Sequence, residues 1–473
     1  MSELAEKSLV EIAALIRQGE VSPVEVMETH LRRVGQFNPS LRAVVTLNPH
    51  AQERARAAEK AIVEGRKVGP LHGVPVTIKD TIDTAGIRTA CGSRILKRHL
   101  PDRDAPAVAR LKAAGAIILG KTNASEMAVA YDADNPVFGR TNNPHDLLCS
   151  PGGSSGGEAA ALAACLSPGG LGSDLAGSLR LPAHFCGVVG LKPTSGVVAN
   201  EGQWPRAVGP LNMGAAIGPV ARRVADAYLL FEVLNLRRRL GSRSFAEPEG
   251  LLANFAQRLR GRGFFWYTDD GQTPVAPEVQ TAIANVVEVL EKAGLQGRRE
   301  FPPGLQEGPR LWQELFSHAA GQQISELYAG RETEAGPGLQ AFLNAHAQRP
   351  APTLEGFMKA WRERDELRGE LLRELEDTPF IVAPVGSFPA PLHDARRVNV
   401  KGEEISLFRA FGYAQTYNVY GLPAVSVPAG WTAAGLPIGA QIIGRPCAEH
   451  EILAAAALIE SALGGWRKPA FVP

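Results

Sequence analysis

Residues 172–194 read GSDLAGSLRLPAHFCGVVGLKPT, which places Ser178 in a glycine-containing stretch that runs into an apolar segment. Closer to the N-terminus, residues 150–164 read SPGGSSGGEAAALAA and contain Ser154. A third stretch, GPLHGVPVTIKD, contains Lys79. In each stretch a residue with proton-transfer chemistry stands beside glycines or a short apolar run, and the three occur in a fixed order along the chain.

Shorter motifs accompany these stretches over most of the chain: Gly120-Lys121-Thr122-Asn123, Gly218-Pro219-Val220-Ala221-Arg222, Gly421-Leu422-Pro423-Ala424 and Leu436-Pro437-Ile438-Gly439. Together with the three stretches they make the chain similar to the amidase signature family, whose members cleave carbon–nitrogen bonds with a Ser-Ser-Lys triad. The resemblance implies a hydrolase of the amidase signature fold, which acts on linear amides and uses neither a metal nor an organic cofactor.

The pattern of elements independently favours an α/β fold. Short apolar runs beside Gly and Pro, at 74–78 and 116–119, are typical of buried strands, and 158–165 and 222–236 have helical patterns. Alternating strands and helices predict a large mixed, mostly parallel central sheet covered by helices on both faces.

We expect a single domain over residues 1–473. Strand-like runs return late in the chain, at 380–385, 424–427 and 441–443, so the chain is expected to re-enter the same sheet. The predicted parts are N-terminal helices (1–65), a catalytic core (66–236), a helical excursion that shapes the substrate pocket (237–377) and a return to the core sheet (378–473).

Composition excludes several classes of protein. The 473 residues are 45% hydrophobic with a formal charge of +1, which permits a large core and gives no footprint for nucleic acid. No apolar run approaches the roughly 20 residues of a membrane span, so a cytoplasmic location is expected. The five cysteines lack CxxC spacing and the ten histidines form no cluster, so we expect buried thiols and no metal.

The glycine-rich segment 152–157 has competing interpretations. It lacks the Gly-Lys-Ser/Thr ending of a phosphate-binding loop. Residues 152–156 formally fit a G-x-S-x-G nucleophile elbow, for which one of the histidines would be the base: His184, His318, His346, His393 or His450. The second serine motif and the upstream lysine favour the Ser-Ser-Lys interpretation instead.

The resemblance implies a role for each member of the triad. Ser178 would be the nucleophile, Ser154 a proton relay and Lys79 the base, with a cis peptide bond at Gly153-Ser154. To accept a proton Lys79 must be neutral, and burial behind the apolar strand before it would lower its pKa. The alternative is a surface lysine paired with Asp80.

The loop before Ser178 is predicted to form the oxyanion hole through backbone N–H groups of Leu175, Ala176, Gly177 and Ser178. The family usually has Asp-x-Gly-Gly-Ser here, whereas this chain has Ala176 at the first glycine, and alanine resists positive φ. Asp174 and Arg180 are expected to hold the loop by hydrogen bonds, and Ser155 to support the site.

The sequence says less about the substrate than about the triad. Pocket walls are proposed at Met127, Tyr131, Gln203 and Trp204, and among aromatic residues of the helical excursion, Trp312, Phe316 and Phe342. The expected substrate is a small or aryl amide, with carbamates as an extension. No nucleic acid, no membrane span and no particular oligomeric state are expected.

Two other functions remain open. The first is the glutaminase subunit of a tRNA-dependent amidotransferase, in which Lys-Pro-Thr is typically followed by Arg-Val-Ser-Arg-Tyr-Gly. This chain continues instead with SGVVANEG at 195–202. The second is a catalytically inactive binding protein on the same fold.

Overall fold

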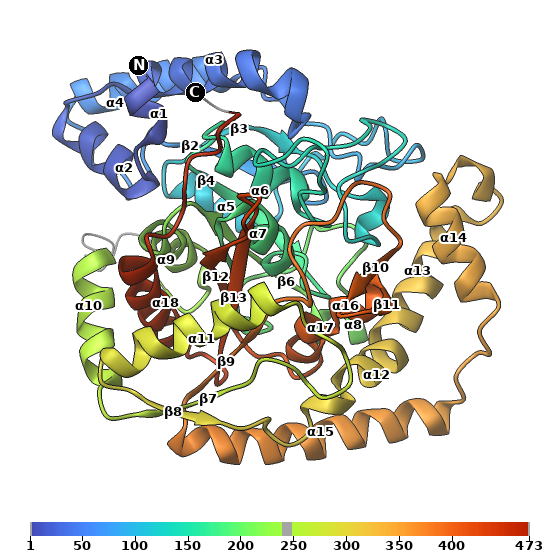
Figure 1. The fold of residues 1–473 in the computed structure, drawn as a ribbon. Coiled ribbons are helices and arrows are strands. Elements are labelled where there is room, and N and C mark those ends of the chain that lie inside the picture. Colours follow the sequence, from blue (N-terminus) through green and yellow to red (C-terminus); the bar gives the residue numbers. More distant parts are fainter. Residues whose placement is uncertain (1, 239–247, 472–473) are drawn as a thin grey trace.

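The computed structural model describes residues 2–238 and 248–471, and its main feature is an 11-stranded sheet in the order β1-β3-β2-β4-β6-β5-β12-β13-β9-β7-β8 (Figure 1). A separate two-stranded ribbon pairs β10 with β11. The strands are β1 (Val44–Leu47), β2 (Pro75–Lys79), β3 (Ile117–Thr122), β4 (Gly169–Asp174), β5 (Val189–Lys192), β6 (Ala216–Ala221), β7 (Gly263–Trp266), β8 (Gln296–Arg299), β9 (Phe380–Pro384), β10 (Arg397–Val400), β11 (Glu403–Ser406), β12 (Ala424–Trp431) and β13 (Pro437–Gly444).

The sheet is mixed. Parallel pairs form two blocks, in which β3 and β4 flank β2, and β8 and β9 flank β7. Antiparallel pairs join the other neighbours. The large mixed sheet is therefore as expected, although antiparallel pairs outnumber parallel ones in the described chain. One reason is the short turn between β12 and β13, closed by a Thr432 N–H to Leu436 carbonyl bond of 2.8 Å, because so short a connection permits only antiparallel pairing.

Helices cover both faces of the sheet (Figure 1). They are α1 (Ser2–Glu6), α2 (Leu9–Gln18), α3 (Pro23–Leu41), α4 (Ala51–Val63), α5 (Pro106–Ala113), α6 (Gly156–Ala163), α7 (Arg180–Cys186), α8 (Pro210–Gly214), α9 (Val224–Leu234), α10 (Pro248–Leu259), α11 (Pro277–Lys292), α12 (Gly308–Trp312), α13 (His318–Tyr328), α14 (Pro337–Ala347), α15 (Leu354–Asp377), α16 (Leu407–Ala410), α17 (Gly412–Val419) and α18 (Glu449–Leu463).

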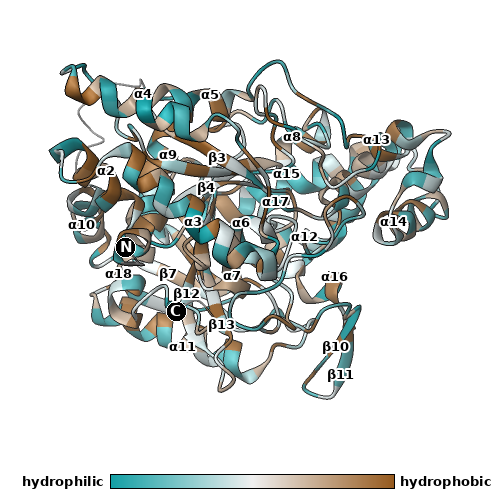
Figure 2. Ribbon diagram, turned by 90° about the horizontal axis from the view of Figure 1, so that it is seen from above, coloured by the Kyte–Doolittle hydropathy of each residue, from teal (hydrophilic) through white to brown (hydrophobic). Residues whose placement is uncertain are grey.

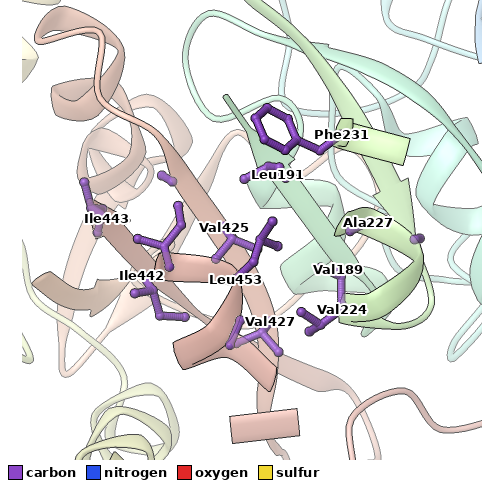
Figure 3. Close-up of a cluster of buried hydrophobic side chains, with 14 of the residues drawn as sticks. Val189, Leu191, Val224, Ala227, Phe231, Val425, Val427, Ile442, Ile443 and Leu453 are labelled. Atoms are coloured by element: carbon purple, nitrogen blue, oxygen red, sulfur yellow. The ribbon is translucent and has the colours of Figure 1, made fainter. Parts of the chain in front are cut away.

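The alternation of side chains on β5 shows why both faces are covered. Leu191 lies beside Phe231 and Val189 beside Val224, both on α9, in the hydrophobic cluster of Figure 3. Gly190 faces the other way, where a Cβ would lie 2.5 Å from the backbone oxygen of Leu179 and 2.9 Å from Ala183 of α7. Successive residues of a strand point to opposite faces, so α9 and α7 lie on opposite sides of the sheet.

The core follows the hydrophobic pattern of the sequence. Figure 2 shows hydrophobic residues on β3 and α9, whereas the ribbon β10–β11 is largely hydrophilic. Four of the five cysteines are buried, as expected, and Cys447 is exposed. Within residues 2–238 and 248–471 we find no helix with the length and hydropathy of a membrane span. The cytoplasmic location stays a prediction.

The N-terminal region and the segment 237–377 contain strands that the sequence did not reveal. β1 lies within residues 1–65 and pairs with β3, and β7 and β8 lie within 237–377 and extend the central sheet. The helical excursion is thus helical only in part. These strands have four residues each, and β8 reads QGRR with no residue fully buried. β1 (VVTL) and β7 (GFFW) are apolar, but apolar runs this short do not distinguish a strand from a buried helical segment. Residues 239–247 lie outside the described residues.

Helix ends follow local chemistry. Ser22 caps α3 by accepting the Glu25 N–H at 3.1 Å, with Pro23 at the first helical position. A reciprocal capping box forms at α2, where the Ser8 N–H also donates to the Glu11 carboxylate at 2.6 Å. These caps fix the helices that pack beside β2 and β3.

Candidate active site

Lys79 and Ser154 are in direct contact. Lys79 ends β2 with its side chain fully buried, and its Nζ donates to Ser154 Oγ at 2.6 Å. The same Nζ donates to Ser173 Oγ, near the end of β4, at 3.0 Å. β2 and β4 are parallel neighbours, so their carboxyl ends meet at one edge of the sheet. The expected cis peptide bond at Gly153-Ser154 is present.

Glycines make this close approach possible. A Cβ on Gly153 would lie 1.9 Å from the Asp132 backbone oxygen, and a Cβ on Gly157 would lie 2.4 Å from the Asn123 backbone nitrogen. Neither position can hold a side chain without displacing backbone. The Gly-rich sequence thus seats the start of α6, and Ser154 with it, against the strand that carries Lys79.

The environment of Lys79 favours the neutral amine. Burial lowers its pKa to about 7, against the weaker raising effects of Cys91, Asp174 and Glu158. Asp80, which could have paired with a surface lysine, instead faces Lys121 at 3.7 Å. Lys79 is therefore a buried lysine bonded to two hydroxyls.

Ser178 lies on the loop between β4 and α7 and is 6% exposed. In the described chain no hydrogen bond joins its Oγ to Ser154. The loop is nevertheless anchored at the same place, because Ser155 Oγ donates to the Ser173 carbonyl at 3.2 Å and also accepts the Ser173 N–H. Ser155 thus has the supporting position expected of it.

The histidines proposed as the base of a nucleophile elbow have partners other than the two serines. His184 is fully buried, with Nε2 at 3.0 Å from the Phe388 carbonyl and Nδ1 accepting the Gly439 N–H at 2.6 Å. His450 contacts Glu232 at 2.8 Å. His393 bonds the Leu147 carbonyl, and the rings of His318 and His346 pack edge to face in the helical segment. No histidine of the described chain bonds Ser154 or Ser178.

A buried ion pair shapes the loop before Ser178. Asp174 accepts from Arg180 at 3.1 Å and from Asn418 at 2.9 Å, and its two oxygens also accept the N–H groups of Gly177 and Leu179. The Arg180 guanidinium outweighs the effect of burial and holds the pKa of Asp174 well below its usual range. Asp174 thus bonds both Arg180 and two backbone N–H groups of the loop.

This geometry corrects one part of the expected oxyanion hole. The Gly177 N–H donates to Asp174 Oδ1 at 2.7 Å and is unavailable to a substrate. The carboxylate captures it because the loop folds back over the ion pair. Among the described residues we find no acceptor for the N–H groups of Leu175, Ala176 and Ser178, which leaves these three donors beside the serine.

The substitution of alanine for the family glycine causes no backbone strain. Ala176 is absent from the residues with positive φ, whereas Gly177 has φ of 102°. A Cβ on Gly177 would also lie 2.6 Å from Cβ of Ala414. Gly177 is the position in this loop that requires glycine.

The proposed pocket residues divide into two groups. Met127 is fully buried in a core cluster with Cys91 and Tyr328, and Trp204 packs against that cluster. Gln203 is 6% exposed and donates to Asn200. Met127 and Trp204 thus pack with the helical segment, whereas Gln203 bonds the loop after β5.

Tyr131 has a different setting, because it belongs to an aromatic wall formed with Phe408, Phe411 and Trp312. Tyr131 lies 5.1 Å from Phe411 and 6.3 Å from Phe408, and Phe408 lies 5.4 Å from Trp312, all between ring centroids. Trp312 Nε1 donates to the Leu175 carbonyl at 2.7 Å. Residue 132, next to Tyr131, packs on Gly153. The wall therefore runs from the oxyanion loop to the loop of Ser154.

Several site residues escaped the sequence analysis. Ser173 bonds Lys79, and Asn418 and Gln441 accept from Arg180 at 2.7 and 2.8 Å. Gln441 carried a signal, since it is the polar residue within the apolar strand PIGAQIIG. Among the described residues no group of three or more His, Cys, Asp or Glu could hold a metal ion.

Comparison with known proteins agrees with the motifs. The Amidase family model matches residues 25–453. The A subunit of the glutamyl-tRNA(Gln) amidotransferase of Thermus thermophilus is 34% identical over 470 residues, which cover 95% of this chain and 95% of that protein.

Two solved structures are similar throughout. A chain from a vestigial protein complex that reveals the evolutionary origins of an s-triazine catabolic enzyme has a TM-score of 0.87 and 27% identity, covering 98% of this chain and 100% of its own. A bacterial aryl acylamidase of the amidase signature enzymes has a TM-score of 0.83 and 27% identity, covering 96% of each chain. With the match to the family model, these likenesses confirm that the chain belongs to the amidase family, the amidase signature enzymes.

Proposed function

We propose that this chain hydrolyses the carbon–nitrogen bond of a small or aryl amide, and also carbamates, through an acyl-enzyme on Ser178. The observation that carries the proposal is the buried contact of 2.6 Å between Lys79 Nζ and Ser154 Oγ. Burial lowers the pKa of this lysine to about 7, so a large fraction is neutral near physiological pH and can accept a proton.

The same proton path serves both acylation of Ser178 and hydrolysis of the ester that forms on it. Ser178 Oγ attacks the carbonyl carbon and gives its proton to Ser154, which passes its own proton to Lys79. Lys79 returns the proton through Ser154 to the leaving nitrogen, so a neutral amine departs and an ester remains on Ser178. Water then attacks this ester and loses its proton along the same path. The ester bond breaks, the acid leaves and Ser178 recovers its proton.

Charge on the carbonyl oxygen is stabilised by backbone donors. The N–H groups of Leu175, Ala176 and Ser178 have no protein acceptor in the described chain, while Asp174 and Arg180 fix the loop that carries them. Donors held in place before reaction are worth most in a site with little water. This arrangement suits the tetrahedral intermediate of acyl transfer.

The aromatic wall supports an aryl or other apolar group on the substrate. Tyr131, Phe408 and Trp312 are aromatic side chains beside both reactive loops, and Phe408 is 36% exposed. Aromatic rings favour contact with other rings at centroid distances of about 4.5–7 Å. The bacterial aryl acylamidase among the structural neighbours fits this preference.

A second candidate is the glutaminase subunit of a tRNA-dependent amidotransferase. The curated relatives favour it over the first, because A subunits of glutamyl-tRNA(Gln) amidotransferases, including the protein from Halothermothrix orenii at 31% identity, match along 95–98% of this chain. Against it stands the sequence at 195–202, which departs from the continuation typical of those subunits. In this role the chain would work with partner subunits.

Hydrolysis of three substrates by the purified chain and its Ser178→Ala variant separates the candidates. The substrates are an aryl anilide, the corresponding aryl carbamate and glutamine. We expect Ser178-dependent cleavage of the anilide, and carbamate cleavage at a comparable rate. Preferred hydrolysis of glutamine would favour the amidotransferase subunit. Absence of Ser178-dependent turnover and of labelling by a fluorophosphonate would overturn the hydrolase and favour an inactive binding protein.

A further inference from the structure

Glu158 lies in the first turn of α6, four residues after Ser154, and is fully buried. Its Oε1 accepts the Thr77 hydroxyl at 2.5 Å and its Oε2 accepts the Thr122 hydroxyl at 2.6 Å. Burial raises the pKa of Glu158 to about 7, and the hydroxyl donor on each carboxyl oxygen partly offsets this by favouring the ionised form. The sequence analysis assigned no role to this residue.

The sheet is shaped to receive this carboxyl group. A Cβ on Gly170 of β4 would lie 2.0 Å from Glu158 Oε1 and 2.4 Å from the Thr77 carbonyl. Any side chain at this position would displace Glu158 from Thr77. Glycine on β4 therefore keeps the carboxyl group in the layer between α6 and the sheet.

Strand β2 places Lys79 on the same side of the sheet as Glu158. Thr77 and Lys79 are two residues apart on one strand, so their side chains share a face. Both reach α6, since Thr77 bonds Glu158 and Lys79 bonds Ser154. The interaction is mutual, because Glu158 raises the pKa of Lys79 and Lys79 lowers that of Glu158.

The other charged groups around Lys79 are already engaged. Asp174, at the end of β4, bonds Arg180 and Asn418. The Cys91 thiol, on the loop after β2, has its pKa raised well above its usual range by burial and stays neutral. Asp80, the next residue in the chain, faces Lys121 at 3.7 Å. Glu158 differs from both aspartates, because the donors to its carboxyl oxygens are neutral hydroxyls.

We propose that Glu158 is a positioning residue for the reaction, whose carboxylate stabilises the ammonium formed on Lys79 when Ser178 loses its proton. Through Thr77 it also fixes the end of β2, so that Lys79 Nζ meets Ser154. This inference rests on the proposed function of the triad. Glu158 touches neither the substrate nor Ser178 in this arrangement and acts through Lys79 alone.

The test is a Glu158→Gln variant, in which the amide preserves the shape of the side chain and removes the charge. The protonation midpoint of Lys79 is measured by NMR of protein labelled with ¹³C at lysine Cε, with the signal assigned by a Lys79→Met variant. We expect the midpoint to fall, because the carboxylate that raises the pKa of Lys79 is lost. The acid limb of the kcat/KM profile should move down with it, and kcat above pH 8 should fall several-fold because the base is weaker, with KM little changed.

A matched control is Glu460→Gln. Glu460 lies on α18 and accepts the Val224 N–H at 3.1 Å. Burial raises its pKa to about 7, as it does for Glu158. Because Glu460 is outside the site, its variant should leave both the lysine midpoint and the pH profile unchanged. An equal shift in this control would attribute the effect to general destabilisation and overturn the proposal.

Thr122→Val supplies the test if Glu158→Gln fails to fold. It removes one hydroxyl donor from the carboxylate and should lower the Lys79 midpoint by a smaller amount. An unchanged midpoint in whichever of the two variants folds would overturn the role of Glu158. The NMR titration needs no turnover, so a shifted midpoint in a chain without Ser178-dependent activity would refute the proposed reaction instead.

Discussion

The edge of the sheet around β2 and β4 uses charge differently from the helical segment between α12 and α15. At the edge, Lys79 and Arg180 are fully buried and their partners are fixed by several hydrogen bonds. In the helical segment, Arg310 is 42% exposed and faces three glutamates, Glu307, Glu314 and Glu363. Buried charges shift pKa values and are costly to unpair, whereas exposed pairs contribute little. The proposed proton transfer therefore takes place at the edge, and the surface of the helical segment is expected to tolerate substitution.

The largest effect on activity should come from Lys79→Met, which keeps the length of the side chain and removes the amine. We expect kcat/KM on an aryl anilide to fall by about 10²–10⁴-fold, because the proton acceptor is lost. Lys192→Met is the matched control, since Lys192 is also buried with a pKa lowered to about 7 but bonds the Pro193 carbonyl rather than a serine. A loss below about tenfold in the Lys79 variant would place the general base elsewhere.

Arg180→Met should give the largest loss of stability. It leaves Asp174 buried without its cation, and removal of one partner from a buried pair costs about 3–5 kcal/mol. Urea denaturation measures the free energy of unfolding. If the cost were within the range of an exposed pair, the loop of Ser178 would be held by Asn418 and backbone donors rather than by the ion pair.

The pH dependence of activity and of stability should reveal the buried amine. Activity should rise with pH through about 7, because Lys79 must be neutral to accept the proton. Between about 7 and its usual value of 10.5 the unfolded state binds more protons at this lysine, so its contribution makes the free energy of unfolding rise with pH. Glu158 acts in the opposite sense between 4.5 and about 7, where the folded state keeps the proton.

Denaturation curves of Lys79→Met and Glu158→Gln against pH separate the two contributions. The first variant should lose the part of the rise above pH 7 that Lys79 contributes, and the second should lose the part of the fall below pH 7 that Glu158 contributes. A rise that persisted in Lys79→Met would belong to another buried lysine, such as Lys192.

The sequence predicted the parts of the fold and site that depend on local pattern. Short apolar runs gave β2, β3 and β9 to within a few residues, and the glycine-rich motifs gave Ser154 beside Lys79. These features can be predicted because the residues that create them are neighbours in the chain. The motif also implied the cis bond before Ser154 that the structure contains.

The remainder depends on partners far apart in the chain. Asn418 and Gln441 reach Arg180 across 238 and 261 residues. Gln441 is placed by the pairing of β13 with β12, and Asn418 by the position of α17. The capture of the Gly177 N–H by Asp174 depends on how one loop folds back, which no residue pattern specifies. Strand β8 belongs to the sheet because it pairs with β7, and its own polar residues do not predict a strand.

The smallest effect is expected from Arg310→Ala, which removes an arginine with three carboxylate partners at once. Each partner is exposed or half-buried, and pairs of this kind contribute about 0–1 kcal/mol apiece, so the free energy of unfolding should fall by about 3 kcal/mol at most. Part of that change should disappear in 1 M salt, where screening is strong. Activity on the anilide should stay within about twofold, because surface substitutions away from a site rarely disturb it. A large loss of activity would mean that the position of Trp312, two residues on, depends on this network, and the division between a chemical edge and a tolerant helical surface would fail.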